Sequence, residues 1–178
     1  LQRAEHLEEI NRRRQDQTAR IVSEAKERAM LVQERRVIVI AGEGWNKGIV
    51  GLVAGRLAEE FYKPVIVLEK TDEFSTGSAR TAGSFDILAA LKHASKHLVR
   101  FGGHKQAAGL TIETGKFEIF YQKVLEYAEI NLSEEGLQHQ LVLDAELEEA
   151  DLSPVTCNLL LQLEPFGVGN PKPKFLIF

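Results

Sequence analysis

The chain has 178 residues, 44% of them hydrophobic and 27% charged, a composition typical of a soluble globular protein. Its net charge of −4 argues against a protein that coats nucleic acid by bulk positive charge, although it allows a local basic site. The one cysteine, Cys157, excludes an internal disulfide and a cysteine-based zinc cluster. No apolar run approaches the roughly 20 residues that span a bilayer. We therefore expect a cytoplasmic protein, and the start at Leu1 indicates a piece of a longer one.

Residues 1–34 predict one long helix, because glycine and proline are absent and helix-favouring residues dominate. The apolar stripe of this helix is thin, so we expect it to connect two bodies rather than to form a core. The cluster Arg12–Arg14 is expected to be a solvated face, with a nucleic-acid contact as the less favoured alternative.

The following hundred residues predict an α/β domain, which we place at residues 36–136. A strand–helix–strand unit, with strands at 37–41 and 65–68 and a helix at 49–61, predicts a parallel strand pair. Beyond it the pattern predicts strands at 77–82 and 110–112, and helices at 87–98 and 116–131.

The last segment, residues 137–178, changes character. It predicts a strand at 141–147, a helix at 154–163 and a strand at 175–178. So few residues cannot form an independent domain. We expect either an appendage or the opening of a second domain.

The run Phe101–Leu110 contains the most distinctive local pattern of the chain. Gly102 and Gly103 free the backbone to approach a ligand, and successive N–H groups in such a turn can hold an anion. His104 places an imidazole beside them. This pattern predicts an anion-binding loop; a tight turn between a helix and a strand, with an incidentally exposed histidine, is an equally open alternative.

Two further pairs have spacings that suggest ligand binding. Ser78 and Arg80 are two apart on a predicted strand and hence on one face, where a hydroxyl and a guanidinium can clamp a phosphate. An ordinary surface pair is the alternative interpretation. His93 and His97 have the spacing of zinc ligands on a helix, but a third ligand is missing. We therefore expect a solvated helix surface there and no metal site in this chain.

The turn at residues 42–48 suggests a dinucleotide site. Its glycines follow a strand and precede a helix, and Glu69 ends the next strand about 20 residues later, as in nicotinamide-dinucleotide proteins. However, the glycine spacing is one residue too long, and Trp45 puts bulk where a pyrophosphate would lie. A tight turn with an anchoring tryptophan is the preferred interpretation.

The motif at 101–110 resembles the G-G-H-x-x-A-A-G motif of the DHH-associated domain of DHH-family phosphoesterases. Four more segments narrow the resemblance to the RecJ family of single-stranded-DNA-specific exonucleases: 43–51, 77–80, 85–87 and 163–171. The opening run 10–15 is similar to the helix that joins the two lobes of that family. The resemblance covers nearly the whole chain in the family's order.

This resemblance implies a DHH-associated α/β domain with a mixed sheet flanked by helices. A long inter-lobe helix at 1–35 would precede the domain, and the start of an OB-like β domain at 137–178 would follow it. The implied activity is stepwise 5′→3′ hydrolysis of single-stranded DNA in recombination and repair, with Mn²⁺ or Mg²⁺. The metal ligands of the family lie in a lobe upstream of Leu1, so this chain alone is expected to be inactive.

The resemblance also implies roles for particular residues. Ser78 and Arg80 match the family's Ser-x-Arg, which implies that they hold a terminal 5′-phosphate. Our hypothesis for Gly102, Gly103 and His104 is that they bind the phosphate backbone next to the cleaved bond, with His104 acting in catalysis. We expect a monomer that binds single-stranded DNA and no membrane.

Two alternatives of other classes remain at this point. The chain could belong to a related phosphodiesterase that acts on short oligonucleotides or cyclic dinucleotides, or it could be a non-enzymatic nucleic-acid-binding module. A DHH-type set of Asp and His upstream would support an enzyme, and the OB-like tail favours the RecJ family over the small phosphodiesterases.

Overall fold

The computed structural model describes residues 2–138 and 141–178, which divide into two compact units, Leu1–Gln138 and His139–Phe178. Residue 1, in the expected long helix, and residues 139–140, in the expected tail, lie outside the described part. Each unit is described by itself.

The first unit contains four α-helices and five strands. The helices are α1 (Gln2–Met30), α2 (Lys47–Phe61), α3 (Ile87–His93) and α4 (Phe117–Asn131). The strands are β1 (Ile38–Glu43), β2 (Val65–Lys70), β3 (Phe74–Arg80), β4 (Leu98–His104) and β5 (Ala107–Glu113). The expected α/β class is confirmed.

The five strands form one mixed sheet in the order β1-β2-β3-β5-β4. β1 and β2 are parallel and are joined through α2, as the strand–helix–strand pattern predicts. All other neighbours are antiparallel. β1 and β4 therefore form the two edges of the sheet.

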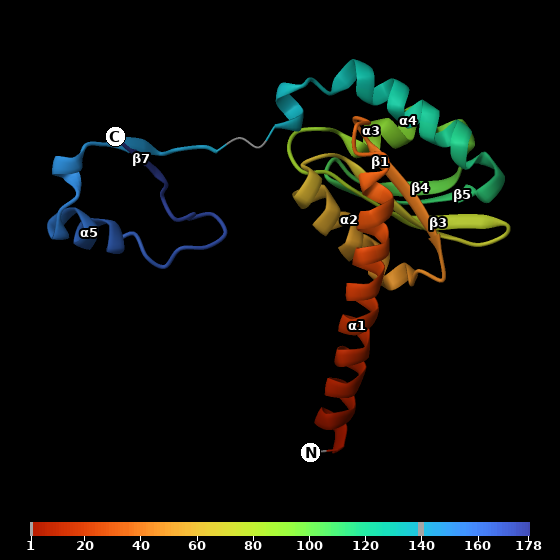
Figure 1. The fold of residues 1–178 in the computed structure, drawn as a ribbon, viewed down its shortest axis with the longest axis horizontal. Helices are drawn as coiled ribbons and strands as arrows, with labels where there is room; N and C mark the ends of the chain where they lie inside the picture. The colour runs from red at the N-terminus through yellow and green to blue at the C-terminus, as the bar shows by residue number, and fades with distance from the viewer. Residues whose placement is uncertain (1, 139–140) are drawn as a thin grey trace. The chain divides into compact units, whose positions relative to one another are not determined.

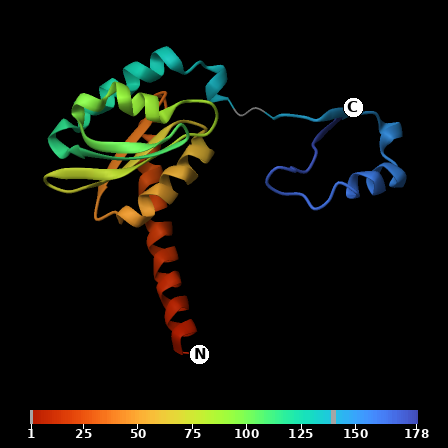
Figure 2. The ribbon, with the colours of Figure 1, turned by 180° about the vertical axis from the view of Figure 1, so that it is seen from behind.

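Helices cover both faces of this sheet (Figures 1 and 2). Side chains alternate along each strand, so Val65 and Val67 pack with α2 on one face, here called the α2 face. Ile66 and Leu68 belong to the core cluster that includes α3 and α4 on the other face. α2 contacts β2 and β3, whereas α3 contacts β4 and β5 from the opposite side.

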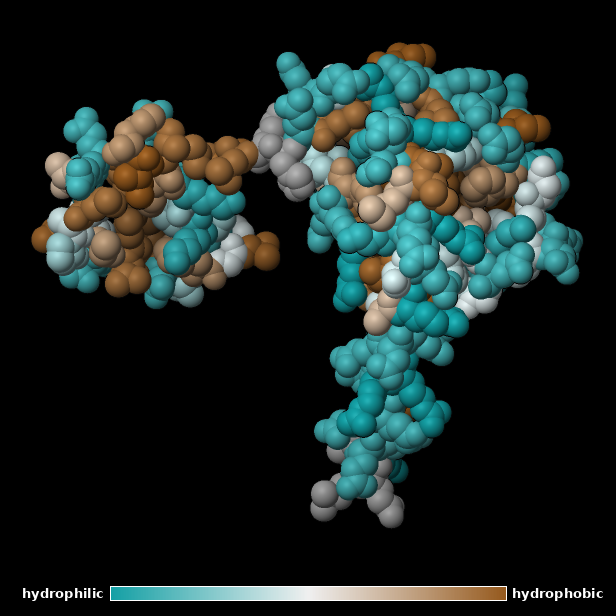
Figure 3. Space-filling view, in the orientation of Figure 1, coloured by the Kyte–Doolittle hydropathy of each residue, from teal (hydrophilic) through white to brown (hydrophobic). Residues whose placement is uncertain are grey.

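The long helix α1 has two different halves. Ile21, Ala25 and Ala29 in its second half are buried in the cluster that contains α2 and β1. Its first half extends away from this body and is covered with hydrophilic side chains (Figures 1 and 3). The predicted helix is confirmed, but the expectation that it forms no core is wrong for its last three turns, because those small and apolar residues share one face.

The structure shortens the helix expected at 87–98. α3 begins at an Asp86 cap, whose side chain accepts from the Ala89 N–H at 2.9 Å, and ends at His93. A 3₁₀ turn, Ser95–His97, follows, and Leu98 already opens β4. Because the chain turns from α3 into β4 here, Leu98 is partly buried against the core. Helix propensity alone does not predict this turn.

The second unit contains α5 (Pro154–Leu161) and a parallel pair of short strands, β6 (Ala145–Leu147) and β7 (Phe175–Ile177). Ser153 caps α5 by accepting from the Thr156 N–H. None of the residues described between 141 and 178 is buried, and Figure 3 shows hydrophobic side chains on the surface of this unit. So short a segment cannot enclose a core of its own. Its OB-like character stays a prediction.

Candidate phosphate-binding site

The segment expected to be an anion-binding loop is a β-hairpin. β4 and β5 pair antiparallel, and the hairpin turn lies at Lys105 and Gln106. Two backbone bonds hold this turn: the Ile87 N–H donates to the Lys105 carbonyl at 3.0 Å, and the Thr81 N–H to that of Gln106 at 3.2 Å. The predicted loop and the alternative helix-to-strand turn are both wrong, because cross-strand pairing outweighs the poor strand propensity of two glycines.

The two adjacent glycines of the hairpin have different reasons to be glycine. Gly103 has a φ of +148°, and a Cβ there would lie 2.3 Å from the Ala107 carbonyl oxygen. A Cβ on Gly102 would have no atom within 4 Å. The fold therefore requires Gly103, whereas the bare backbone at Gly102 is accessible to a ligand.

The sheet register brings four of the five expected site residues onto the α2 face. Val67 pairs with Ser78, so Ser78 shares the face on which α2 packs. The row through Ser78 continues to Gly109 and Gly102, and the row through Arg80 continues to Ala107 and His104. Strands are about 4.8 Å apart, so Arg80 and His104 lie roughly 10 Å apart. They can thus contact neighbouring groups of one ligand.

A bulge in the edge strand sets this register. Leu98 pairs with Ile112 but Arg100 pairs with Thr111, so Val99 is an extra residue. A one-residue shift moves every side chain of a strand to the other face. Without the bulge, Gly102 and His104 would lie on the side of α3 and α4.

The bulge also brings Arg100 onto the α2 face, and sequence reasoning did not identify this residue. Its Nε donates to Thr111 Oγ1 at 3.1 Å, and that hydroxyl lies 3.1 Å from Thr76 Oγ1. Arg100 thus places a positive charge, fixed by its hydrogen bond to Thr111, beside the row formed by Ser78, Gly109 and Gly102. No local pattern signals it, because its orientation depends on the bulge.

A hollow of about 780 Å³ opens beside Ser78 and Arg80, between β3 and α2. Its lining contains four positively charged side chains and only one carboxylate, that of Glu59. The four, which come from α1, α2 and β3, are Arg14, Lys47, Arg56 and Arg80. Arg80 Nη1 donates to the Ala79 carbonyl oxygen at 2.8 Å. In a chain of net charge −4, this is the local basic site that the composition allowed. Arg14, Lys47 and Arg56 were not identified from sequence as its lining.

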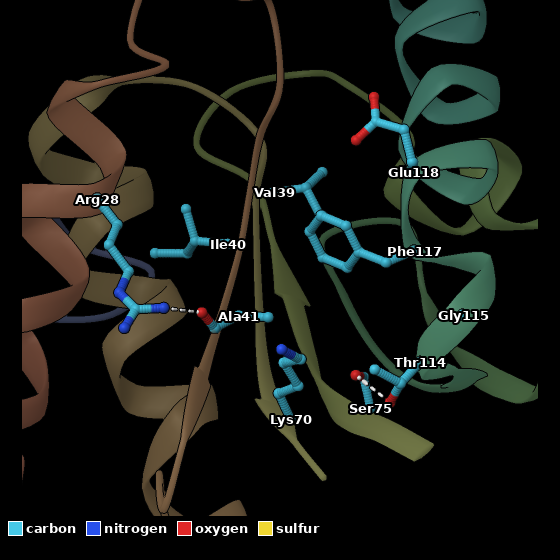
Figure 4. A pocket seen from close by; sticks show the side chains of 10 residues that line it. All are labelled: Arg28, Val39, Ile40, Ala41, Lys70, Ser75, Thr114, Gly115, Phe117 and Glu118. Atoms are coloured by element: carbon cyan, nitrogen blue, oxygen red, sulfur yellow. Dashed lines mark hydrogen bonds between the residues drawn. The ribbon is translucent and has the colours of Figure 1, made fainter. Parts of the chain in front are cut away.

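A second hollow, of about 510 Å³, lies beside the β1 edge and has a different character (Figure 4). Several of its polar groups already have hydrogen-bond partners within the lining. Arg28 donates to the Ala41 carbonyl oxygen, and the Ser75 and Thr114 hydroxyls are 3.0 Å apart. Phe117 forms an apolar wall beside Val39 (Figure 4). None of the residues expected to bind phosphate lines this hollow.

The turn after β1 is built around Trp45, as the anchoring interpretation expects. Trp45 is fully buried, and its Nε1 donates to Glu24 at 2.9 Å. A Cβ at Gly42 would lie 2.1 Å from the indole ring, so glycine is required where strand and tryptophan meet. Asn46 caps α2 by accepting from the Gly48 N–H at 2.8 Å. Gly42 thus serves packing, and Gly48 takes part in the helix cap.

The described residues offer no ligand set for a metal ion, since no group of three or more His, Cys, Asp or Glu side chains comes together among them. His93 and His97 do not share a helix: one ends α3 and the other lies in the 3₁₀ turn. Within the described part, no helix combines the length and the apolar character needed to cross a membrane.

Residues 34–129 match the family model of the DHHA1 domain. The chain is 33% identical to the single-stranded-DNA-specific exonuclease RecJ of Bacillus subtilis, over 98% of this chain and 22% of that protein. It is also 33% identical to RecJ of Thermus thermophilus, over 97% of this chain and 24% of that protein. The chain therefore spans about a quarter of the length of these relatives.

Solved structures agree with the sequence comparisons. The crystal structure of RecJ from Thermus thermophilus in complex with Mn²⁺ superposes with a TM-score of 0.81 at 30% identity, covering 97% of this chain and 25% of that one. The Mg²⁺ complex of RecJ from the same organism gives a TM-score of 0.76 at 29% identity, covering 94% and 26%.

Proposed function

Since the chain belongs to the DHHA1 domain family and matches RecJ exonucleases over nearly its whole length, we propose that it is the substrate-binding part of a 5′→3′ single-stranded-DNA exonuclease. One observation carries the proposal: the sheet register gathers Ser78, Arg80, Gly102 and His104 on one face, beside a cation-lined hollow. A bare backbone flanked by hydrogen-bond donors suits a phosphate chain.

The 5′ end of the strand would lie in the hollow beside Ser78 and Arg80. A guanidinium binds phosphate oxygens as a planar fork, and a hydroxyl adds a further donor. A terminal phosphate carries more negative charge than a phosphodiester, so it gains most from the surrounding Arg14, Lys47 and Arg56. Recognition of that end gives the enzyme its 5′→3′ direction.

His104 and Gly102 would hold the backbone phosphate nearest the cleaved bond, with Gly103 fixing the strand that carries them. Gly102 admits the phosphate because nothing projects from it. His104 would donate a hydrogen bond to a phosphate oxygen, and a contact that tightens in the transition state lowers the barrier. Mn²⁺ or Mg²⁺ bound by another part of the enzyme would activate the water for hydrolysis.

This assignment makes the isolated chain a binding module without nuclease activity. We expect the purified chain to bind single-stranded oligonucleotides and to release no nucleotides in the presence of Mn²⁺. Mn²⁺-dependent hydrolysis that persists through exhaustive purification would contradict the assignment. We place the whole enzyme in the cytoplasm, as a monomer that acts in DNA recombination and repair.

The test of the proposed function is Arg80→Ala in the full-length enzyme. A charge-assisted hydrogen bond contributes about 1.5–3 kcal/mol. This energy corresponds to a fall of about 10- to 100-fold in kcat/KM for 5′-phosphorylated oligonucleotides. The same oligonucleotides with a 5′-hydroxyl should lose far less. Equal losses on both ends would refute the role of Ser78 and Arg80.

A further inference from the structure

Helix α2 passes directly over Ser78 and Arg80 at Gly51. A Cβ at Gly51 would lie 3.1 Å from Ser78 Oγ and 3.2 Å from Arg80 Nη2. Both contacts are tighter than carbon normally tolerates, so at least one of the two side chains would have to shift. One turn later, a Cβ at Gly55 would meet no atom within 4 Å. The Ser78 and Arg80 side chains therefore occupy the space that a side chain at residue 51 would need.

Backbone conformation does not explain Gly51. It lies inside a regular α-helix, where glycine is unfavourable relative to alanine because it loses more conformational freedom on folding. Its φ is not in the left-handed region, unlike those of Gly44 and Gly103. What glycine provides at this position is space above Ser78 and Arg80.

That space determines where the Arg80 guanidinium lies. Nη1 is held by the Ala79 carbonyl oxygen at 2.8 Å, and Nη2 lies against the bare backbone of Gly51. The guanidinium is thus confined between its own strand and the helix. Bidentate binding of a phosphate requires both donors to be near 2.7–2.9 Å from their acceptors, so a displacement of a few tenths of an ångström changes the fit.

We propose that Gly51 is a positioning residue that sets the relative placement of the Arg80 guanidinium and the Ser78 hydroxyl, and thereby the preference of the enzyme for 5′-phosphorylated ends. The proposal rests on the proposed function of Ser78 and Arg80. Gly51 lines the same hollow but brings no side chain into it. It acts through the two side chains beneath it.

The experiment compares Gly51→Ala and Gly51→Leu with Gly115→Ala and Gly115→Leu in the full-length enzyme. The Gly115 variants are matched controls, because they make the same change where space is open and outside the hollow beside Ser78 and Arg80. The readout is the ratio of kcat/KM for 5′-phosphorylated over 5′-hydroxyl oligonucleotides of one sequence. The melting temperature is measured for every variant.

We expect Gly51→Ala to lower this ratio about 3- to 10-fold, since a misplaced binding group loses part of its effect, and Gly51→Leu to remove most of it. Both Gly115 variants should keep the ratio of the parent. Alanine favours a helix more than glycine does, and the Ser78 and Arg80 side chains can move away from a methyl group, so the melting temperature of Gly51→Ala should stay close to that of the parent. A loss of selectivity at an unchanged melting temperature cannot come from unfolding.

The outcomes separate this inference from the proposed function. If Arg80→Ala lowers the ratio but both Gly51 variants keep it, the positioning role of Gly51 is overturned and the proposed function stands. If Arg80→Ala leaves the ratio unchanged, the proposed function of the pair fails, and the positioning role fails with it. An equal loss in the Gly51 and Gly115 variants would also overturn the inference, because the effect would then not depend on the contact of residue 51 with Ser78 and Arg80.

Discussion

The two edges of the sheet are built from opposite kinds of sequence. β1 begins with buried aliphatic residues, and side chains occupy two carbonyls along this edge: the Tyr121 hydroxyl donates to Val37, just before the strand, at 3.0 Å, and Arg28 donates to Ala41. β4 is exposed from Val99 to His104 and carries two glycines, an arginine and a histidine. One edge is closed by the protein itself, and the other is left open.

This difference shows how one sheet separates stability from binding. Side chains that satisfy the β1 carbonyls prevent another strand from pairing there. On the other side of the sheet, α2 contacts β2 and β3 and β4 is exposed, so the polar groups of Arg100 and His104 remain accessible beside the bare Gly102. Changes near β1 should therefore affect folding, and changes to the groups that β4 presents on the α2 face should affect substrate use.

The largest effect is expected for Trp45→Ala, on the β1 side. The indole is fully buried against Gly42 and makes a hydrogen bond to Glu24. Removing so large a side chain costs about 3–5 kcal/mol of unfolding free energy. Urea denaturation should show this loss, whereas oligonucleotide binding per folded molecule should persist at low temperature. A variant as stable as the parent would refute the anchoring role of Trp45.

On the β4 side, His104→Ala should act on chemistry alone. Loss of a transition-state donor lowers turnover about 10²-fold, while the exposed position of His104 predicts an almost unchanged melting temperature. His6→Ala, at an exposed histidine of α1, is the matched control and should leave kcat unaltered. Near-normal turnover by a well-folded His104→Ala enzyme would end the catalytic proposal.

The two glycines of β4 allow the same comparison at adjacent residues. Gly103→Ala places a Cβ 2.3 Å from a backbone oxygen at a φ of +148°, so we expect a loss of stability of about 1–3 kcal/mol. Gly102→Ala has open space and should melt normally. Its methyl group would instead hold the phosphate away and lower kcat/KM by about tenfold, the effect of roughly one lost hydrogen bond. Reversed behaviour of the two variants would contradict the assignment.

Sequence patterns predicted the β1 side of the unit well. The continuous apolar runs at 37–41 and 65–68 bury both of their faces, so composition alone identifies them as core strands. The parallel pairing followed from the helix between them. The amphipathic helix 116–131 is also found, as α4, within one residue of its predicted start.

The β4 side was predicted less well, because its structure depends on partners. Gly102 and Gly103 resemble a loop until the pairing with β5 is known. Ser78 and Arg80 could be placed on one face from their spacing, but their alignment with His104 needs the register, and the register needs the bulge at Val99. A bulge is a tertiary feature without a local sequence signal, so Arg100 was missed.

The smallest effect is expected for Tyr121→Phe, which opens one carbonyl of the closed β1 edge. The hydroxyl donates to Val37 at 3.0 Å, and a typical hydrogen bond contributes about 0.5–1.5 kcal/mol. Burial raises the pKa of the Tyr121 phenol, and the Arg35 guanidinium over its ring lowers it by less. With a raised folded-state pKa, the stabilisation is complete below about pH 10, the ordinary value, and is lost as the pH rises through the folded pKa. Chemical denaturation from pH 7 to 11 should therefore show that the free energy of unfolding falls more steeply with pH for the parent than for Tyr121→Phe. Equal slopes would mean that ionisation of Tyr121 does not affect the stability of the fold.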